Sequence, residues 1–310
     1  MAVAARPVTA VSVLWRFARP HTLIGTTLSI LGIYAIAAGE LPAVALGDGL
    51  GDLALTLLAG VLVNVYIVGL NQIEDVEIDR VNKPRLPIAA GDLTIGGAWR
   101  VVAGSGMVVL ILAWTQGWVE VVAVVAAMAI GTAYSAAPLR LKRYPVVAAA
   151  SISIVRALVV NVGVYEHFAA SLGGRAELSA VPAPIVALTL FMLPFSFAIA
   201  VLKDLPDASG DRLFRIATFT VRLGPRRALA MGMAALTAGY LCMAVLGPLL
   251  VPSADPWLLS GGHLLALALL WHWAASTDTG DHAAITRFYM RVWVLFFFEY
   301  LLVPAAVLAG

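Results

Sequence analysis

Long apolar runs recur along the whole chain, and they constrain its fold more than any other feature. Nearly every run can supply the roughly 20 residues that a helix needs to cross a bilayer. Only 12% of the 310 residues are charged, whereas an ordinary soluble protein has about 25%. The sequence therefore predicts an all-α, polytopic membrane protein. We expect nine transmembrane helices, within residues 22–39, 53–73, 98–114, 119–133, 146–165, 184–202, 228–246, 258–273 and 290–308.

The Lys and Arg residues fall on one side of the expected membrane. Membrane proteins concentrate these residues in their cytoplasmic connections. With a cytoplasmic N-terminus, nine helices place all but two of the 20 Lys and Arg residues on the cytoplasmic side. The exceptions are Arg156, inside a helix, and Arg175, outside. A helix count wrong by one would scatter the basic residues over both sides, so the asymmetry supports both the count and the orientation.

No Gly/Ser-rich or Pro-rich linker divides the chain, and we expect residues 1–310 to form a single domain. The single cysteine, Cys242, cannot form an intrachain disulfide. The composition points to the lipid bilayer as the surroundings of the protein, and nothing in it indicates a nucleic-acid partner.

The first of two acidic motifs follows the second expected helix. It reads Asn71-Gln-Ile-Glu-Asp75-Val-Glu-Ile-Asp79-Arg80. At about 3.6 residues per turn, positions 71, 75 and 79 advance only about 40° per step along a helix. The pattern therefore predicts three oxygen donors on one helical face.

The second motif lies at the matching end of the sixth expected helix. It contains Lys203, Asp204, Asp207 and Asp211. Offsets of three and seven return to one face if the helix continues, although we expect Pro206 to distort its last turn. Both motifs lie in the longest connections of the cytoplasmic side, where acidic and basic residues occur together.

Carboxylates aligned this closely repel each other, and near hydrocarbon they are poorly hydrated, so they need a compensating cation. Mg²⁺ prefers oxygen ligands and is commonly held by one or two carboxylates together with substrate phosphates. No His/Cys cluster suggests zinc. We therefore predict Mg²⁺ as a cofactor that bridges a diphosphate to both motifs. Its expected ligands are Asn71, Asp75, Asp79, Asp204, Asp207 and Asp211.

Three other interpretations of the motifs are weaker. Solvated loops with helix-flanking charges account for one such motif more readily than for two at equivalent helix ends. A CDP-alcohol phosphotransferase would carry its aspartates in a single motif with Asp-Gly and further glycines, which neither segment shows. An ion transporter would place its acidic residues within helices, near the bilayer midplane.

The motifs resemble those of the UbiA superfamily of intramembrane prenyltransferases, NxxxDxxxD and DxxDxxxD. Within that superfamily, the chain is most similar to the branch of homogentisate phytyl, geranylgeranyl and solanesyl transferases of tocopherol and plastoquinone synthesis. Similar blocks run from residue 19 to residue 300, at 19–26, 66–72, 134–143, 203–211 and 288–300. One departure is Ala137, where the branch tends to have a second proline.

This resemblance implies nine helices around a central cavity, which the two motifs cap and which opens sideways to lipid. It also implies a Mg²⁺-dependent enzyme that transfers a prenyl group from a prenyl diphosphate to an aromatic acceptor. The acceptor is expected to be homogentisate or another phenolic acid such as 4-hydroxybenzoate. We expect the protein in the bacterial inner (plasma) membrane, with the motifs on the cytoplasmic side. The sequence leaves the prenyl length, the prenylated position and the oligomeric state open.

Ionisation of an allylic diphosphate leaves negative charge on the diphosphate and a carbocation on the prenyl chain. The five aspartates are expected to be catalytic through the metal, which stabilises the leaving diphosphate. The ring of Tyr134 is expected to stabilise the carbocation. Nearby basic residues are expected to donate hydrogen bonds to the diphosphate: Arg80, Lys142, Arg143 and Lys203. Anchoring to anionic lipid is the alternative for Lys142 and Arg143.

Polar residues inside apolar helices are candidates for function, because burying them is costly. Asn64 lies two helical turns before the first motif and is expected to face the same cavity. Arg156 is expected to bind a substrate or to pair with Glu299. Arg19 and His21 are expected to recognise an acceptor carboxylate, with interfacial anchoring as the alternative.

Two further functions stay open at this stage. A UbiA-type membrane terpene cyclase shares the ionisation step but needs no acceptor. A transporter or a non-catalytic lipid-binding protein would release no diphosphate from any prenyl donor.

Overall fold

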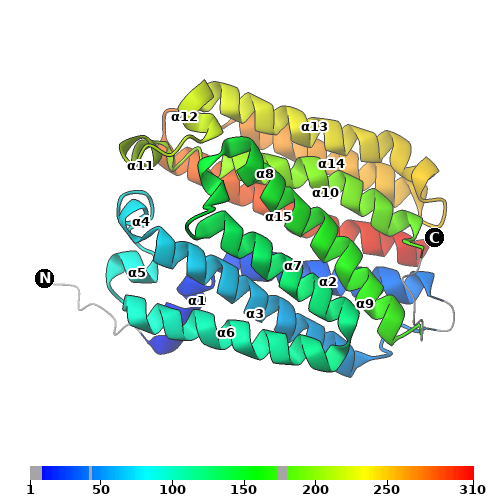
Figure 1. Ribbon diagram of the computed structural model, residues 1–310. Coiled ribbons are helices and arrows are strands. Elements are labelled where there is room, and N and C mark those ends of the chain that lie inside the picture. Colours follow the sequence, from blue (N-terminus) through cyan, green and yellow to red (C-terminus); the bar gives the residue numbers. More distant parts are fainter. Residues whose placement is uncertain (1–8, 42–43, 174–179) are drawn as a thin grey trace, which may run out of the picture.

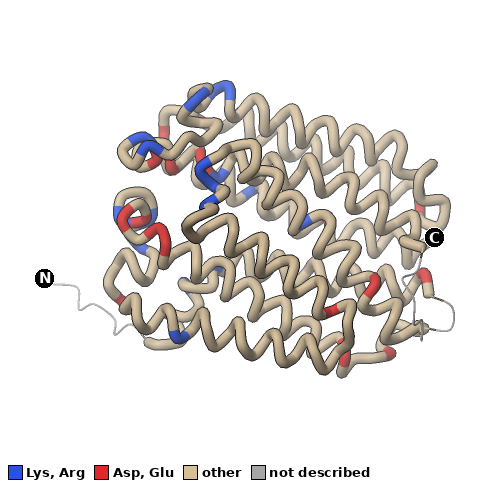
Figure 2. The backbone as a smooth tube through the Cα atoms, in the orientation of Figure 1, with Lys and Arg blue, Asp and Glu red and all other residues tan. Residues whose placement is uncertain are grey.

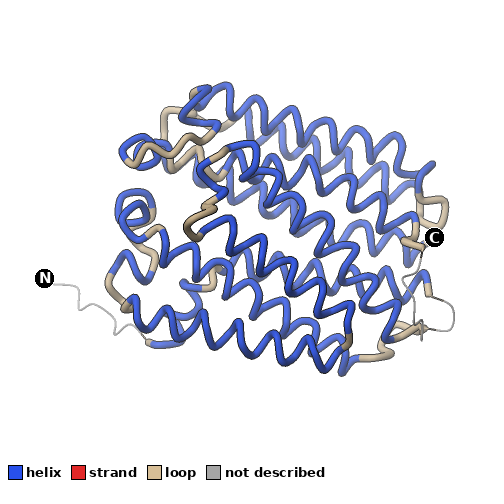
Figure 3. The backbone as a smooth tube through the Cα atoms, viewed as in Figure 1, coloured by secondary structure: helices blue, strands red, loops and turns tan. Residues whose placement is uncertain are grey.

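The computed structural model describes residues 9–41, 44–173 and 180–310. Within these residues the regular structure is entirely helical (Figure 3). Nine of the described helices are long and apolar enough to cross a membrane, and they lie side by side in one bundle (Figure 1). The expected fold class and number of spans are confirmed. Arg175 lies outside the described residues.

Each observed span contains its expected counterpart. The first four are α2 (Pro20–Glu40), α3 (Leu50–Glu74), α6 (Ile95–Gln116) and α7 (Trp118–Ser135). The fifth runs continuously over Pro145–Ser171 and comprises α8 (Pro145–Ser153), the π-helix η2 (Ile154–Gly163) and α9 (Val164–Ser171). The others are α10 (Ala183–Leu202), α13 (Pro225–Leu250), α14 (Pro256–Ala275) and α15 (His282–Ala309).

Short helices lie before the first span and in the connections between spans. They are α1 (Ala10–Phe17), α4 (Val76–Asn82), α5 (Pro87–Ala90), η1 (Leu141–Arg143), α11 (Ala208–Leu213) and α12 (Phe219–Leu223). Several of the long helices begin at capping residues: the side chains of Thr94, Asp255 and Asp281 accept hydrogen bonds from the first turns of α6, α14 and α15. Such caps satisfy backbone N–H groups that have no partner within the helix.

The spans form a closed ring around a central cavity. α2 packs against α3 and α15, α3 against α7, α7 against η2, η2 against α10, and α10 against α15. α6, α13 and α14 pack outside this ring. In α10, 72% of the span is buried, against 22% in α14, because α10 is apolar all round and lies between neighbours on several sides. α2 approaches α15 closely at Gly32, where a Cβ atom would lie 2.6 Å from the Tyr300 carbonyl oxygen.

Neither acidic motif continues its helix, which corrects the expected alignment. α3 ends at Glu74, and Asp75 adopts a non-helical backbone (φ −112°, ψ 16°) before α4 begins at Val76. After α10, the chain turns over residues 203–207 before α11 begins. The aspartates are therefore distributed over two helix ends and two short helices, and tertiary packing has to bring them together.

Charged residues are distributed unequally between the two ends of the bundle. Figure 2 shows Lys and Arg gathered at the end that carries α4, α5, α11 and α12, whereas the opposite end shows acidic residues. Arg156, within η2, is the basic residue of the described chain that lies deep in a span. This asymmetry agrees with the expected distribution of basic residues.

Candidate active site

Two connected cavities run through the ring. The first, which we call the polar cavity, has a volume of about 480 Å³ and is lined by Asn71 and all five motif aspartates. The second, the apolar cavity, has about 290 Å³ and lies among α2, α3, α7, the fifth span and α15. Six residues line both and form a neck between them: Arg19, His21, Asn71, Tyr134, Lys203 and Tyr289. The charged motifs thus lie on one side of the neck, and the apolar cavity lies on the other.

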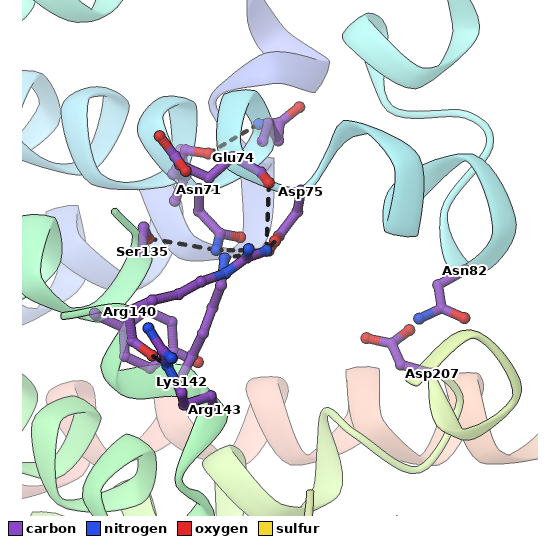
Figure 4. Close-up of polar contacts among 12 residues, drawn as sticks. Asn71, Glu74, Asp75, Asn82, Ser135, Arg140, Lys142, Arg143 and Asp207 are labelled. Atoms are coloured by element: carbon purple, nitrogen blue, oxygen red, sulfur yellow. Dashed lines mark hydrogen bonds and ion pairs between the residues drawn. The ribbon is translucent and has the colours of Figure 1, made fainter. Parts of the chain in front are cut away.

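Asp75, at the end of α3, is the centre of the first motif (Figure 4). Asn71 Nδ2 donates to Asp75 Oδ2 at 3.0 Å. Two basic side chains from the segment after α7 also reach it: Arg140 Nη2 lies 3.0 Å from Oδ1 and Lys142 Nζ lies 2.6 Å from Oδ2. The carboxylate of Asp75 is therefore neutralised by two cations of this chain.

The second motif is held by Lys203 and by the first motif. Lys203 Nζ donates to Asp204 Oδ1 at 2.9 Å and to the Tyr134 hydroxyl at 3.2 Å. Lys83, just after α4, forms an ion pair with Asp207. The Lys83–Asp207 pair joins residues 124 positions apart in sequence, and it holds the segment after the first motif against the second motif.

Asn82 provides a second link between the motif segments. Its side-chain oxygen accepts from the Gly210 N–H at 3.0 Å, and its Nδ2 donates to Asp211 Oδ1 at 3.3 Å. A side chain at position 210 has no room, since a Cβ atom there would lie 2.2 Å from Asn82 Oδ1. In Figure 4, Asn82 and Asp207 face each other across the gap between α4 and α11.

Burial raises the pKa values of three motif aspartates, even though basic side chains lie close to them. Burial raises the pKa of Asp79 to about 6, despite the opposing effect of Arg19 and Lys83. Burial, together with the carboxylates of Asp204 and Asp207, raises the pKa of Asp211 to about 7. Burial also raises the pKa of Asp204 despite its contact with Lys203. A bound cation would therefore favour the ionised form of these three carboxylates.

The residues fit a magnesium ion that is shared with a substrate. Asp79 is 4% exposed, and its Oδ2 atom has no hydrogen-bond partner within the described part of the chain. This buried oxygen is therefore a candidate ligand for a cation. No group of three or more His, Cys, Asp and Glu side chains within the described chain is close enough to hold a metal alone. Mg²⁺ usually keeps water and substrate phosphates among its ligands. The oxygen donors therefore suit a metal–diphosphate complex better than a cage made of protein alone.

Three predicted residues meet at the neck. Arg19 adopts a left-handed backbone (φ 52°), and its buried Nε has no partner in the described residues. Strained non-glycine residues of this kind cluster at functional sites. His21 contacts Trp293, with ring centroids 4.9 Å apart, and Tyr134 accepts the bond from Lys203. The structure thus brings Arg19, His21 and Tyr134 together between the two cavities.

Arg156 faces the apolar cavity from η2. Its guanidinium carbon lies 4.7 Å from the ring centroid of Trp293 and 5.5 Å from that of Phe296. The expected alternative, a pair with Glu299, is wrong: Glu299 Oε1 instead lies 2.9 Å from Nε2 of His263. Among the described residues, Arg156 has no carboxylate partner within salt-bridge distance. A buried guanidinium without a counter-ion is a candidate for binding an anionic ligand.

Two predicted basic residues lie elsewhere. Arg80 pairs with Glu77 at 2.6 Å on the exposed side of α4, and Arg143 donates to the carbonyl oxygens of Arg140 and Pro138. Neither lines a cavity. Consecutive side chains of a helix point in different directions. Because Arg80 follows the buried Asp79 in α4, its side chain points away from the polar cavity. Asn64 does line the apolar cavity, although its Nδ2 donates to the Ala18 carbonyl oxygen at 3.0 Å.

Sequence reasoning missed Asn82, Lys83 and Arg140. Arg140 shares the segment of Lys142, and Asn82 and Lys83 follow the first motif directly. Their proximity to the motifs was visible, but the direction of their side chains depends on the helix break at Asp75 and on the turn before η1. The site residues are therefore better predicted from the whole charged segment around each motif than from the regularly spaced residues alone.

Comparison with known proteins gives the family of the chain. The model of the UbiA prenyltransferase family matches residues 24–295. The chain belongs to this family. A homogentisate phytyltransferase of Synechocystis is 43% identical, over 94% of both proteins, and homogentisate phytyltransferase 1 of Arabidopsis thaliana is 37% identical, over 94% of this chain and 74% of its own length. The expected resemblance is confirmed.

Solved structures of UbiA proteins share the fold. A UbiA homolog from Archaeoglobus fulgidus, bound to GPP and Mg²⁺, superimposes with a TM-score of 0.61 at 19% identity, over 95% of this chain and the whole of the other. This likeness supports the arrangement of the helices. With nine apolar helices, this UbiA protein is an integral membrane protein.

Proposed function

We propose that the protein is a Mg²⁺-dependent aromatic prenyltransferase that transfers a prenyl group from a prenyl diphosphate to homogentisate. One observation carries the proposal: two opposed carboxylate motifs, each already paired with lysine, lie directly above an apolar cavity. The names of the relatives support homogentisate as the acceptor. Because those relatives are named as transferases to an acceptor, a terpene cyclase is not favoured.

The basic residues are proposed to bind the diphosphate. Lys83, Arg140, Lys142 and Lys203 are each paired with a motif aspartate. The five aspartates and Asn71 would hold Mg²⁺, which when bound supplies a Lewis acid for the diphosphate oxygens. The diphosphate oxygens then accept charge-assisted hydrogen bonds from the freed ammonium and guanidinium groups. The same basic side chains thus pair with the motif aspartates in this structure and are proposed to stabilise the leaving diphosphate during the reaction.

The neck and the apolar cavity are proposed to protect the reacting centre. The prenyl chain enters the apolar cavity, whose walls exclude water that would quench a carbocation. Tyr134 lies at the neck, where its ring can stabilise positive charge on the first prenyl unit. Its hydroxyl is fixed by Lys203, so the ring has a defined orientation.

The sidedness of the site is also a proposal. The described Lys and Arg residues concentrate at the motif end of the bundle (Figure 2), and this bias sets the orientation of membrane proteins. We infer that the motifs face the cytoplasm in a bacterial inner (plasma) membrane. A water-soluble prenyl diphosphate head group would then reach the polar cavity from the cytoplasm.

A donor-by-acceptor assay on the purified protein tests the function. With Mg²⁺, geranylgeranyl diphosphate and homogentisate, we expect a prenylated aromatic product and equimolar diphosphate, and we expect EDTA to abolish both. Each donor is also incubated without an acceptor, because a cyclic hydrocarbon formed there would support the cyclase instead. Absence of diphosphate release from every donor would rule out the enzyme and support a transporter or lipid-binding protein.

Arg156 is proposed to bind the acceptor carboxylate. Replacing it by glutamine should raise the KM for homogentisate by roughly 10- to 100-fold, since a hydrogen bond to a charged group is lost. The KM for the prenyl diphosphate should change little, because the motifs are intact. Initial rates measured against each substrate separate the two constants.

Arg291 offers a matched control for Arg156. It also stacks on a tryptophan, with its guanidinium carbon 5.6 Å from the Trp273 ring, but it lines neither cavity. Arg291→Gln should leave both KM values within about twofold of the wild type. An equal rise in the KM for donor and acceptor in Arg156→Gln would contradict the assigned role.

A further inference from the structure

The far end of the apolar cavity carries a buried carboxylate that the proposed chemistry does not use. Glu120, in the first turn of α7, lines the cavity together with Thr56 of α3. It is 4% exposed, and its Oε2 atom has no hydrogen-bond partner among the residues that the structure describes. The other residues lining this half of the cavity are mostly apolar, among them Ile30, Val63 and Val164. The carboxylate of Glu120 therefore lies at the far end of the apolar cavity, in a half that is lined mostly by apolar side chains.

Two further ionisable side chains, His167 and Asp52, lie near Glu120. His167 of α9 lies with Nδ1 3.8 Å from Glu120 Oε2 and Nε2 3.3 Å from Asp52 Oδ2. Asp52 in turn accepts a hydrogen bond from Ser171 at 2.6 Å. The three ionisable side chains come from α3, α7 and α9, so the helices themselves position the cluster. His167 is 1% exposed, and it closes the space beyond Glu120.

The lining residues of α3 and those of α7 give the same length for the apolar cavity. On α3, the lining residues from Asn71 at the neck to Thr56 at the far end span 15 positions, or about 22 Å at 1.5 Å per residue. On α7, Tyr134 at the neck and Glu120 are 14 positions apart, or about 21 Å. Each prenyl unit adds four main-chain bonds, each of which advances an extended chain by about 1.2 Å, so four extended units span about 20 Å and five about 25 Å.

We propose that Glu120, with His167 beside it, is the floor of the prenyl-chain site and limits the donor to about four prenyl units. This inference rests on the proposed function. The end of a longer chain would be pressed against a buried carboxylate and would remove it from its polar surroundings without offering a hydrogen bond. Glu120 is thus a specificity-determining residue, far from the reacting atoms.

The test compares donors that differ by one prenyl unit. The ratio of kcat/KM for geranylgeranyl diphosphate to that for the five-unit geranylfarnesyl diphosphate should be at least about tenfold in the wild type. Glu120→Leu replaces the carboxylate by an apolar group of similar size and should lower this ratio about tenfold. Glu120→Gln keeps a polar floor and should leave the ratio within about twofold. Glu120→Ala repeats the measurement if Glu120→Leu does not insert.

Glu40 provides a control at the same end of the bundle. It ends α2, accepts a hydrogen bond from Ser253 and lines neither cavity. Glu40→Leu should therefore leave the donor ratio unchanged. An unchanged ratio in Glu120→Leu, or an equal change in Glu120→Gln, would overturn the proposed floor.

A short donor separates this inference from the proposed function. Farnesyl diphosphate, with three units, does not reach Glu120, so its transfer reports on the chemistry alone and should be similar in all variants. If the wild type transfers no donor, the proposed function fails, and the floor is then tested by binding. Affinities for prenyl S-thiolodiphosphates of four and five units, measured with Mg²⁺ by tryptophan fluorescence, should show the same change in ratio. The same affinity ratio in the wild type and Glu120→Leu would overturn the floor by this route as well.

Discussion

Asp204→Asn and Asp75→Asn should each lower prenyl transfer by about 10³-fold while the protein still inserts into the membrane. Asparagine keeps the shape of the side chain but replaces one acceptor oxygen by an NH2 donor and removes the charge that is proposed to hold Mg²⁺ and the diphosphate. Asp204 and Asp75 belong to different motifs and contact different cations, Lys203 and Lys142. Transfer is measured with radiolabelled prenyl diphosphate at saturating Mg²⁺, and insertion by the yield of monodisperse protein in detergent.

Glu77→Gln is the matched control for these substitutions. Glu77 lies two residues after Asp75, but its side chain is 68% exposed and contacts Arg80 rather than the cavity. Activity within about twofold of the wild type is expected for this variant. Near-normal activity in both aspartate variants would defeat the proposed mechanism, because neither carboxylate would then be needed for ionisation of the donor.

Gly210→Ala should lower activity by about 10²-fold without a comparable loss of stability. The added methyl group would occupy the position of the Asn82 side-chain oxygen, only 2.2 Å away, and would displace Asn82 from Gly210 and Asp211. The two motif segments would then keep the Lys83–Asp207 ion pair but lose their link through Asn82, and a displacement of about 1 Å between groups that act together can cost this much in rate. Steady-state kinetics and thermal unfolding of the purified variant measure the two effects.

Two variants make the Gly210 result specific. Asn82→Ala removes the same link without adding bulk, and the double variant should be no worse than either single one, since both remove one interaction. Gly104→Ala in α6, where an added Cβ meets nothing within 4 Å, should retain wild-type activity. Full additivity of Gly210→Ala and Asn82→Ala would show that the link between the motifs is not what the methyl group disrupts.

The number and the approximate position of the spans could be predicted from the sequence alone. Each helix must satisfy its own backbone hydrogen bonds in lipid, so length and hydropathy alone set where it can begin and end. The same rule limits charged residues to the ends of the helices, and Arg156 was therefore recognised as unusual before its surroundings were known. The type of chemistry also followed from local pattern, because closely spaced carboxylates need a cation wherever they lie.

The direction of individual side chains could not be predicted in the same way. A regular spacing of four assumes an uninterrupted helix, and α3 ends at Glu74, in the middle of the first motif. Arg80 therefore points away from the cavity, whereas Lys83 and Asn82, which the spacing did not select, reach the second motif. Helix ends are determined by caps and by contacts with other segments, and these are not visible in a short window of sequence.

The sequence by itself determined a membrane-spanning helical bundle with two acidic, cation-requiring motifs at equivalent helix ends, because hydrocarbon and charge repulsion act on local composition. Only the tertiary structure decided that the motifs meet through Asn82 and Lys83, that Arg156 lies on Trp293 rather than against Glu299, and that Glu120 ends the apolar cavity. Each of these depends on contacts between helices far apart in the chain. Packing, not spacing, sets such contacts.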